Sequence, residues 1–112
     1  MSRFVRCSAF LSTLTQPKTK IDSIGYLLGV IRTVQVPFGA EDTSGIVSVD
    51  TWATRWVSAI DVKNLVYYFN STSTSNIVWV DFKNLNFSKY EPVKSVTLQN
   101  VSFVGDISNF LK

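Results

Sequence analysis

A single thiol and two arginines near the start of the chain are the residues with the clearest chemical potential. Cys7 is the only cysteine, and Arg3 and Arg6 lie close to it in the sequence. Neighbouring cations lower the pKa of a thiol and so favour the nucleophilic thiolate. The sequence contains no histidine to serve as a base for this thiol. A cysteine among alternating apolar residues more often packs as a small hydrophobic side chain, and this structural role is favoured for Cys7.

Arg3 has two possible roles. Its planar guanidinium could bind a carboxylate or orient a nucleophile, or it could be a solvated side chain near the start of the sequence. Composition alone favours the solvated side chain.

The acidic residues are not arranged for catalysis. Asp61, Asp81 and Asp106 each stand where a strand is expected to end or a helical turn to begin, and these are the usual places for turn and capping carboxylates. With no histidine and one cysteine, the sequence contains no conventional zinc, haem or iron–sulfur site. We therefore expect neither a metal nor a cofactor.

Three tryptophans could line an apolar ligand pocket or fill a core between layers. They are Trp52, Trp56 and Trp79. For aromatic residues on strands, the core is the favoured position.

Length and composition restrict the class of protein. The chain has 112 residues, of which 46% are hydrophobic and 17% charged, so it is expected to fold as one domain or part of one rather than to be disordered. No apolar run approaches the roughly 20 residues of a membrane-spanning helix. The formal charge is +3, but the lysines and arginines are scattered, which argues against nucleic-acid binding.

The first half of the chain is expected to contain one strand and one main helix. Residues 3–14 place β-branched and aromatic residues in rough alternation, which predicts a strand. Thr19 and Asp22 form a capping-box pattern, so a helix should begin there, and apolar residues at helical spacing extend it to about Val34, before Pro37. The small and polar residues 40–50 predict a surface loop.

The second half is expected to form an antiparallel three-stranded meander. Segments rich in aromatic and β-branched residues lie at 54–62, 65–70 and 76–82, separated by short polar connections. Both faces of this sheet carry apolar residues, which indicates cover on both sides and suggests that other layers of the fold are supplied elsewhere. Residues 85–87 and 93–98 should be short extended pieces, and 105–111 a terminal helical turn. The fold class is therefore α+β.

Read together, these segments resemble the choloylglycine hydrolase family, which includes bile salt hydrolases, penicillin V acylases and other linear amide C–N hydrolases. The resemblance covers nearly the whole chain and follows the order and spacing of the family's C-terminal portion. The matching motifs are Ser2-Arg-Phe-Val-Arg6 with Ala9-Phe10, Val34-Gln-Val-Pro-Phe-Gly39, Thr54-Arg-Trp-Val57, Asp61-Val-Lys-Asn64, Val66-Tyr-Tyr-Phe69, Val80-Asp-Phe82 and Gly105-Asp106.

The resemblance implies an N-terminal-nucleophile hydrolase, a four-layer αββα sandwich to which this chain would contribute a helix and part of one sheet. In such enzymes an N-terminal cysteine attacks the amide carbonyl, its own α-amine serves as the base, and backbone and Asn donors hold the oxyanion. The family's active-site set includes the Arg of the Ser-Arg-Phe motif, which is Arg3 here. The resemblance therefore favours an active-site role for Arg3 over the solvated side chain that composition alone favours. Arg6 is more variable in the family, so no role is transferred to it.

The departures from the family pattern shape the functional expectation. The nucleophile-bearing strand and the Asn donors have no counterpart here, and Cys7 occupies a position where the family usually has a small residue. Met1 resembles an internal methionine of a longer protein. We therefore expect residues 1–112 to be a single partial domain, the C-terminal portion of an amidohydrolase that is inactive alone.

Partners and alternatives follow from the same residues. The full-length enzyme would take a small-molecule amide, and this chain would associate with the missing N-terminal half or with itself through an open sheet. The alternative is a free-standing β-rich interaction module without catalysis. The compartment is left open by the sequence.

Overall fold

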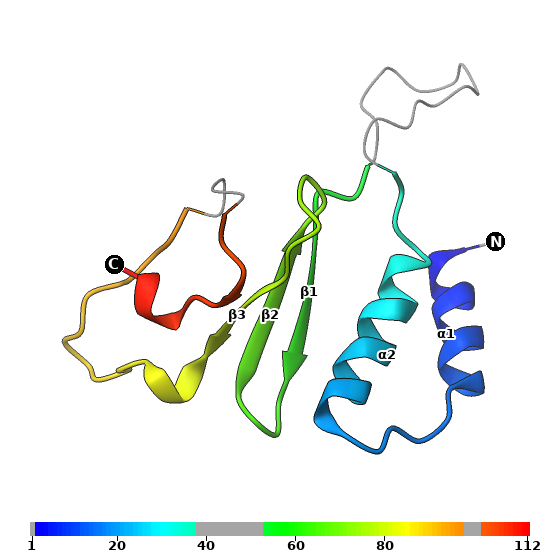
Figure 1. Ribbon diagram of the computed structural model, residues 1–112, viewed down its shortest axis with the longest axis horizontal. Coiled ribbons are helices and arrows are strands. Elements are labelled where there is room, and N and C mark those ends of the chain that lie inside the picture. The colour runs from blue at the N-terminus through cyan, green and yellow to red at the C-terminus, as the bar shows by residue number, and fades with distance from the viewer. Residues whose placement is uncertain (1, 38–52, 98–101) are drawn as a thin grey trace. The chain divides into compact units, whose positions relative to one another are not determined.

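The computed structural model describes residues 2–37, 53–97 and 102–112, which fall into two compact units divided after Arg55. The first unit contains helices α1 (Arg3–Thr13) and α2 (Lys20–Arg32), and the second contains a four-stranded sheet and two short 3-10 helices (Figure 1). The α+β class is confirmed, but with two main helices rather than one. Among the described residues, no helix is long and apolar enough to cross a bilayer.

Residues 3–13 form helix α1, so the predicted strand at 3–14 is wrong. Ser2 caps the helix, because its side chain accepts a hydrogen bond from the Val5 amide at 3.2 Å. Only Val5 and Thr13 are β-branched in this segment, so the short alternation near its start does not outweigh its helix formers.

Helix α2 begins as the capping box predicts. The Thr19 hydroxyl accepts from the Asp22 amide at 3.0 Å, and the Asp22 carboxylate accepts from the Thr19 amide at 3.1 Å. The helix ends at Arg32, with Thr33 as its C-cap, slightly before the predicted Val34. Leu28 and Val30 are buried.

The chain beyond α2 is held by two hydrogen bonds between Val36 and Thr54. The Val36 amide donates to the Thr54 hydroxyl at 3.0 Å, and the Thr54 amide donates to the Val36 carbonyl at 3.1 Å. The loop expected at residues 40–50 lies outside the described residues, as does Trp52.

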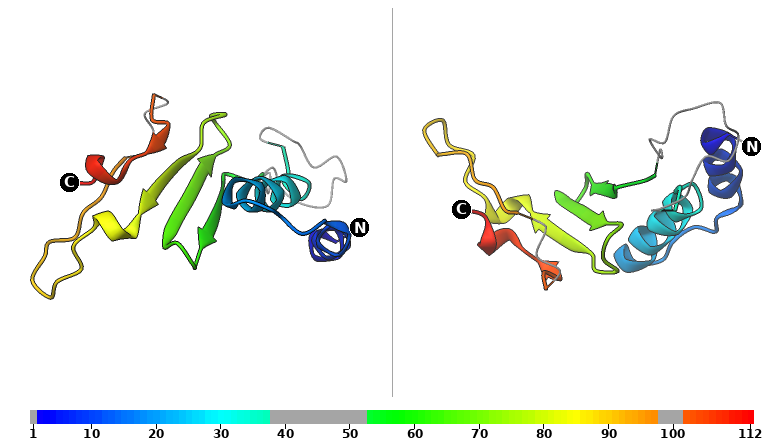
Figure 2. Two further views of the ribbon diagram at one scale, coloured as in Figure 1. Left: turned by 60° about the horizontal axis from the view of Figure 1, so that its bottom comes forward. Right: turned by 90° about the horizontal axis from the view of Figure 1, so that it is seen from above.

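The predicted antiparallel meander is confirmed. Strands β1 (Trp56–Asp61), β2 (Val66–Ser71) and β3 (Val78–Asp81) pair in sequence order. A fourth strand, β4 (Gly105–Asp106), pairs parallel to β3 and was not predicted. Figure 2 shows the strands from two further directions, with β4 beside β3.

Side-chain hydrogen bonds shape both hairpin turns. Asp61 accepts from the backbone amide of Asn64 at 2.9 Å and from its side-chain amide at 2.7 Å. Leu65, which follows, has a φ of 58°. In the second turn, the buried Asn70 side chain donates to the carbonyl oxygens of Thr74 at 3.3 Å and Asn76 at 2.7 Å.

Along β1, one sheet face is buried and the other is exposed in this chain. Val57 and Ala59 of β1 are buried, whereas their neighbours Trp56 and Ile60 are 60% and 56% exposed. We call the side that carries Trp56, Ser58 and Ile60, with the paired Ser71, Phe69 and Tyr67, the open face. The expectation of a core position is therefore wrong for Trp56. Trp79, on the other side, is half-buried with its ring centroid 5.9 Å from that of Tyr68.

The chain after β3 is mostly irregular. A 3-10 helix, η1 (Phe82–Asn84), follows β3, and no strand is assigned at 85–87 or 93–97, where extended pieces were expected. Ser95 and Lys112 nevertheless exchange two backbone hydrogen bonds, at 2.8 and 3.1 Å. The predicted terminal helical turn is present as η2 (Ser108–Phe110), preceded by β4.

Candidate functional site

The candidate site is the start of helix α1, where Arg3 is the first helical residue. Arg3 is exposed and makes no hydrogen bond or ion pair with another described residue. The first turn of α1 contains no acidic residue, although acids are favoured at the positive end of a helix. An acid-free helix start and a guanidinium that has no partner among the described residues together favour an anion at this position.

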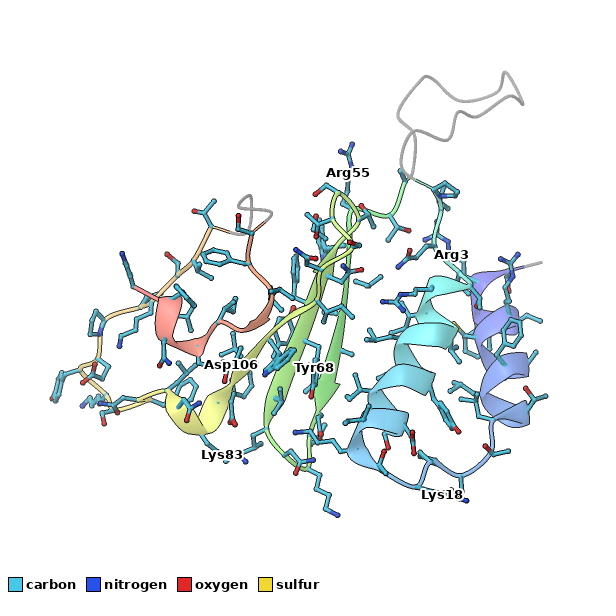
Figure 3. The ribbon with its side chains drawn as sticks, viewed as in Figure 1. Arg3, Lys18, Arg55, Tyr68, Lys83 and Asp106 are labelled. Atoms are coloured by element: carbon cyan, nitrogen blue, oxygen red, sulfur yellow. The ribbon has the colours of Figure 1, made fainter. Side chains whose placement is uncertain are left out.

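Arg6 is held differently from Arg3. Its guanidinium donates a hydrogen bond to the carbonyl oxygen of Thr33 at 2.8 Å. Thr33 is the C-cap of α2, and a cation is favoured at this negative end of a helix. The two helices run in opposite directions, so the start of α1 meets the end of α2, and Arg3 lies at this end of the helix pair (Figure 3).

Cys7 lies on α1, one turn beyond Arg3, as a half-buried free thiol. The chain has no histidine, and the structure places no general base of this kind beside the thiol. The described residues also hold no group of three or more His, Cys, Asp or Glu side chains that could bind a metal ion. Cys7 is therefore a half-buried thiol without a catalytic partner among the described residues.

The three aspartates have the turn and capping roles expected of them. Asp61 closes the β1–β2 turn, and Asp81 accepts from the Lys83 amide at 3.0 Å at the start of η1. Asp106 accepts from the amide and hydroxyl of Ser108, at 2.9 and 2.6 Å. These two hydrogen bonds, the hydroxyl bond first, lower the pKa of Asp106.

Ser108 connects this corner to the sheet. It is 6% exposed, and its hydroxyl accepts from the backbone amide of Asp81 at 2.9 Å. Figure 3 shows Asp106 beside the strands of its unit, on the same side as Tyr68. This cluster fixes the terminal segment to strand β3.

Sequence reasoning assigned no role to Arg6 and did not identify Ser108. The Asp106-Ile-Ser108 spacing is typical of an Asx turn and could have indicated Ser108. No local pattern could have indicated the partner of Arg6, because Thr33 is the C-cap of a different helix, 27 residues further along the chain.

Comparisons with known proteins agree with this arrangement. The sequence profile of the linear amide C–N hydrolases, choloylglycine hydrolase family, matches residues 1–96. A penicillin V acylase of Pectobacterium atrosepticum is 33% identical over 100 residues, covering 77% of this chain and 25% of that protein.

A solved structure is also similar. The penicillin V acylase from Agrobacterium tumefaciens matches with a TM-score of 0.76 and 30% identity, over 98% of this chain and 35% of the acylase chain. The chain thus spans about a quarter of the curated relative and about a third of the solved one. The two helices and the sheet correspond to part of an N-terminal-nucleophile hydrolase fold, and the chain belongs to the choloylglycine hydrolase family of linear amide C–N hydrolases.

Proposed function

We propose that this chain contributes an active-site helix and part of one sheet to an enzyme that hydrolyses linear amides. The substrate class is a penicillin-type amide, an acyl amino acid or a conjugated bile salt. The proposal is supported by the start of α1, a capped helix terminus without acidic residues, where Arg3 of the Ser-Arg-Phe motif has no partner among the described residues. Residues 1–112 then form a single partial domain, the C-terminal portion of the enzyme.

Arg3 is the catalytic residue that this chain supplies. Attack on an amide carbonyl develops negative charge on oxygen, and a fixed cation close to that charge stabilises the transition state. Arg3 is suited to this task because its guanidinium is exposed and makes no hydrogen bond with a described residue. In this role it also holds the surroundings of the nucleophile, which another part of the enzyme provides.

The chain alone is expected not to hydrolyse amides. Its thiol has no histidine to accept a proton, and its similarity extends over only 25% of the curated relative and 35% of the solved one. The open face offers a surface for the remaining layers, because Trp56 and Ile60 leave apolar area in contact with water there.

A reconstitution experiment tests this proposal. The A. tumefaciens acylase is expressed without the segment that this chain matches, and either this chain or the acylase's own segment is co-expressed with it. We expect penicillin V hydrolysis with each segment and none with this chain alone. Activity of the isolated chain, or reconstitution by the acylase's own segment but not by this chain, would contradict the proposal.

A second function is a β-rich interaction module without catalysis. The exposed Trp56 and Ile60 favour it, since an open apolar sheet face is adhesive. Amide exchange should show protected strands in the isolated chain if it is such a module, and the chain would not reconstitute hydrolysis.

A further inference from the structure

We propose that Arg6 is a positioning residue that sets the location of Arg3 by tying the start of α1 to the end of α2. This inference rests on the proposed function, because it concerns how Arg3 is presented to the reacting amide. Arg6 touches no substrate in this account. It acts through the helix that carries Arg3.

Helix α1 is weakly held by apolar packing. None of its residues is buried, and Phe4, next to Arg3, is 81% exposed. An exposed helix of this length is marginal in water unless other contacts hold it. The position of its first turn must therefore depend on a specific polar contact.

The Arg6 side chain supplies such a contact. Its hydrogen bond to the Thr33 carbonyl is 2.8 Å long and half-buried, and it joins α1 to the C-cap of α2. The acceptor is an oxygen at the end of a helix, which has no partner in a continuing turn. The bond thus satisfies that oxygen and places a cation at the negative end of the α2 dipole.

Helix α2 is the better anchored of the two helices. Its start carries the reciprocal capping box of Thr19 and Asp22, and Leu28 and Val30 near its end are buried. The Arg6 hydrogen bond to the C-cap of α2 therefore fixes the start of α1 to a well-anchored helix.

Arg3 and Arg6 lie one helical turn apart, so their side chains leave the same side of α1. Arg6 is engaged, and Arg3 has no partner among the described residues. This division of roles predicts that losing Arg6 leaves the Arg3 cation present but displaced. Displacement of a group that acts in the transition state lowers kcat more than it raises KM.

The test uses the reconstituted enzyme described above and compares Arg6→Met with Arg32→Met. Arg32 is an exposed cation in the last turn of α2, so its variant loses the same charge near the same helix end without breaking the Arg6 bond. We expect Arg6→Met to lower kcat by about 10- to 100-fold, the scale of a misplacement of roughly 1 Å. Arg32→Met should retain kcat, and Arg6→Lys should recover much of the loss because it restores a donor to Thr33.

Two further readouts separate positioning from unfolding. Amide exchange in the 112-residue chain should accelerate in the first turn of α1 for Arg6→Met and stay unchanged in α2. The unfolding temperature of the reconstituted Arg6→Met enzyme should stay close to that of the unsubstituted enzyme. Equal kcat for Arg6→Met and the unsubstituted enzyme would overturn the positioning role alone. Absence of hydrolysis with the unsubstituted chain, when the acylase's own segment restores it, would overturn the proposed function and this inference with it.

Discussion

The Arg6 guanidinium lies 2.8 Å from the carbonyl oxygen of Thr33 and donates a hydrogen bond to it. This contact joins the first turn of α1 to the C-cap of α2, so the helix that presents Arg3 is fixed at the end where Arg3 stands. The family resemblance gave no role to Arg6, yet Arg6 lies one helical turn from Arg3, the residue to which the resemblance assigned an active-site role.

Removing the Thr19 cap should weaken α2. In Thr19→Ala the Asp22 amide loses its acceptor, and the loss of such a cap costs about 1 kcal/mol, within roughly 0.5–2. Urea unfolding followed by far-UV circular dichroism measures the effect. Thr13→Ala, at the last residue of α1, is the matched control, because its hydroxyl donates to a helix carbonyl and does not cap a helix start. Equal effects of the two variants would argue against the capping role.

Ser108→Ala should destabilise the terminal segment of the sheet unit. The substitution leaves the Asp81 amide without its buried acceptor, and an unsatisfied buried group of this kind costs about 1–3 kcal/mol. Amide exchange at Asp81 and through β4 reports the change directly. Ser75→Ala, an exposed serine in the β2–β3 turn, should leave this exchange unaltered. Unchanged protection of Asp81 in Ser108→Ala would refute the assigned role.

The Asp106 carboxylate should make the same segment sensitive to acid. Its folded pKa lies below its ordinary value because Ser108 donates two hydrogen bonds to it. A lowered folded pKa contributes stability that is present above the unfolded pKa of about 3.9 and is lost as the pH falls through the folded pKa. Amide exchange across an acid titration should therefore show β4 losing protection at low pH.

The control for this titration is Asp106→Asn, which removes the titrating group. In Asp106→Asn, the β4 amides should be less protected from exchange at neutral pH than in the unsubstituted chain. Their protection should also fall less on acidification, because the Asp106 carboxylate is no longer there to be protonated. An identical acid response in Asp106→Asn would assign the response to other carboxylates.

We predict that the chain associates with itself through the open face and that removing apolar area from this face weakens the association. Trp56→Ser with Ile60→Thr deletes two exposed apolar side chains. Burying one such side chain is worth about 1.5–3 kcal/mol, so the dissociation constant of the self-associated chain should rise by about tenfold or more. Analytical ultracentrifugation measures this constant. Ile21→Thr, an 84% exposed site on α2, is the control, and an equal effect there would mean that association is nonspecific.

The sequence predicted the elements whose signals are local. The Thr19 and Asp22 capping box marked the start of α2, and the alternating aromatic segments marked the three strands of the meander. The aspartates at strand ends were correctly assigned to turns. In each case the deciding contacts lie within a few residues in the sequence or recur with a regular period.

The errors arose where the decisive interaction was not local or where the pattern was short. The strand predicted at 3–14 rested on brief alternation, and the Ser2 cap makes that segment a helix. Strand β4 has only two residues, and its pairing with β3 depends on a distant part of the chain. Trp56 was expected in a core, but an aromatic side chain on a strand can point to either face, and the pattern did not show which one this chain covers.

The candidate site was predicted in part. The Ser-Arg-Phe motif pointed to Arg3 through the family resemblance, whereas composition alone favoured a solvated residue. The Arg6 contact with Thr33 could not be predicted, because it requires two helices to meet in antiparallel order.

The most direct test of the account is the rate of penicillin V hydrolysis by the reconstituted enzyme carrying Arg3→Ala in this chain. We expect kcat to fall by about 10²- to 10³-fold, the scale for loss of one oxyanion-stabilising group. The stability should change by no more than about 0.5 kcal/mol, because the exposed Arg3 has no partner among the described residues. Lys18→Ala is the control, since Lys18 is an exposed cation at the opposite end of the helix pair (Figure 3). A rate for Arg3→Ala equal to that of Lys18→Ala would contradict the account.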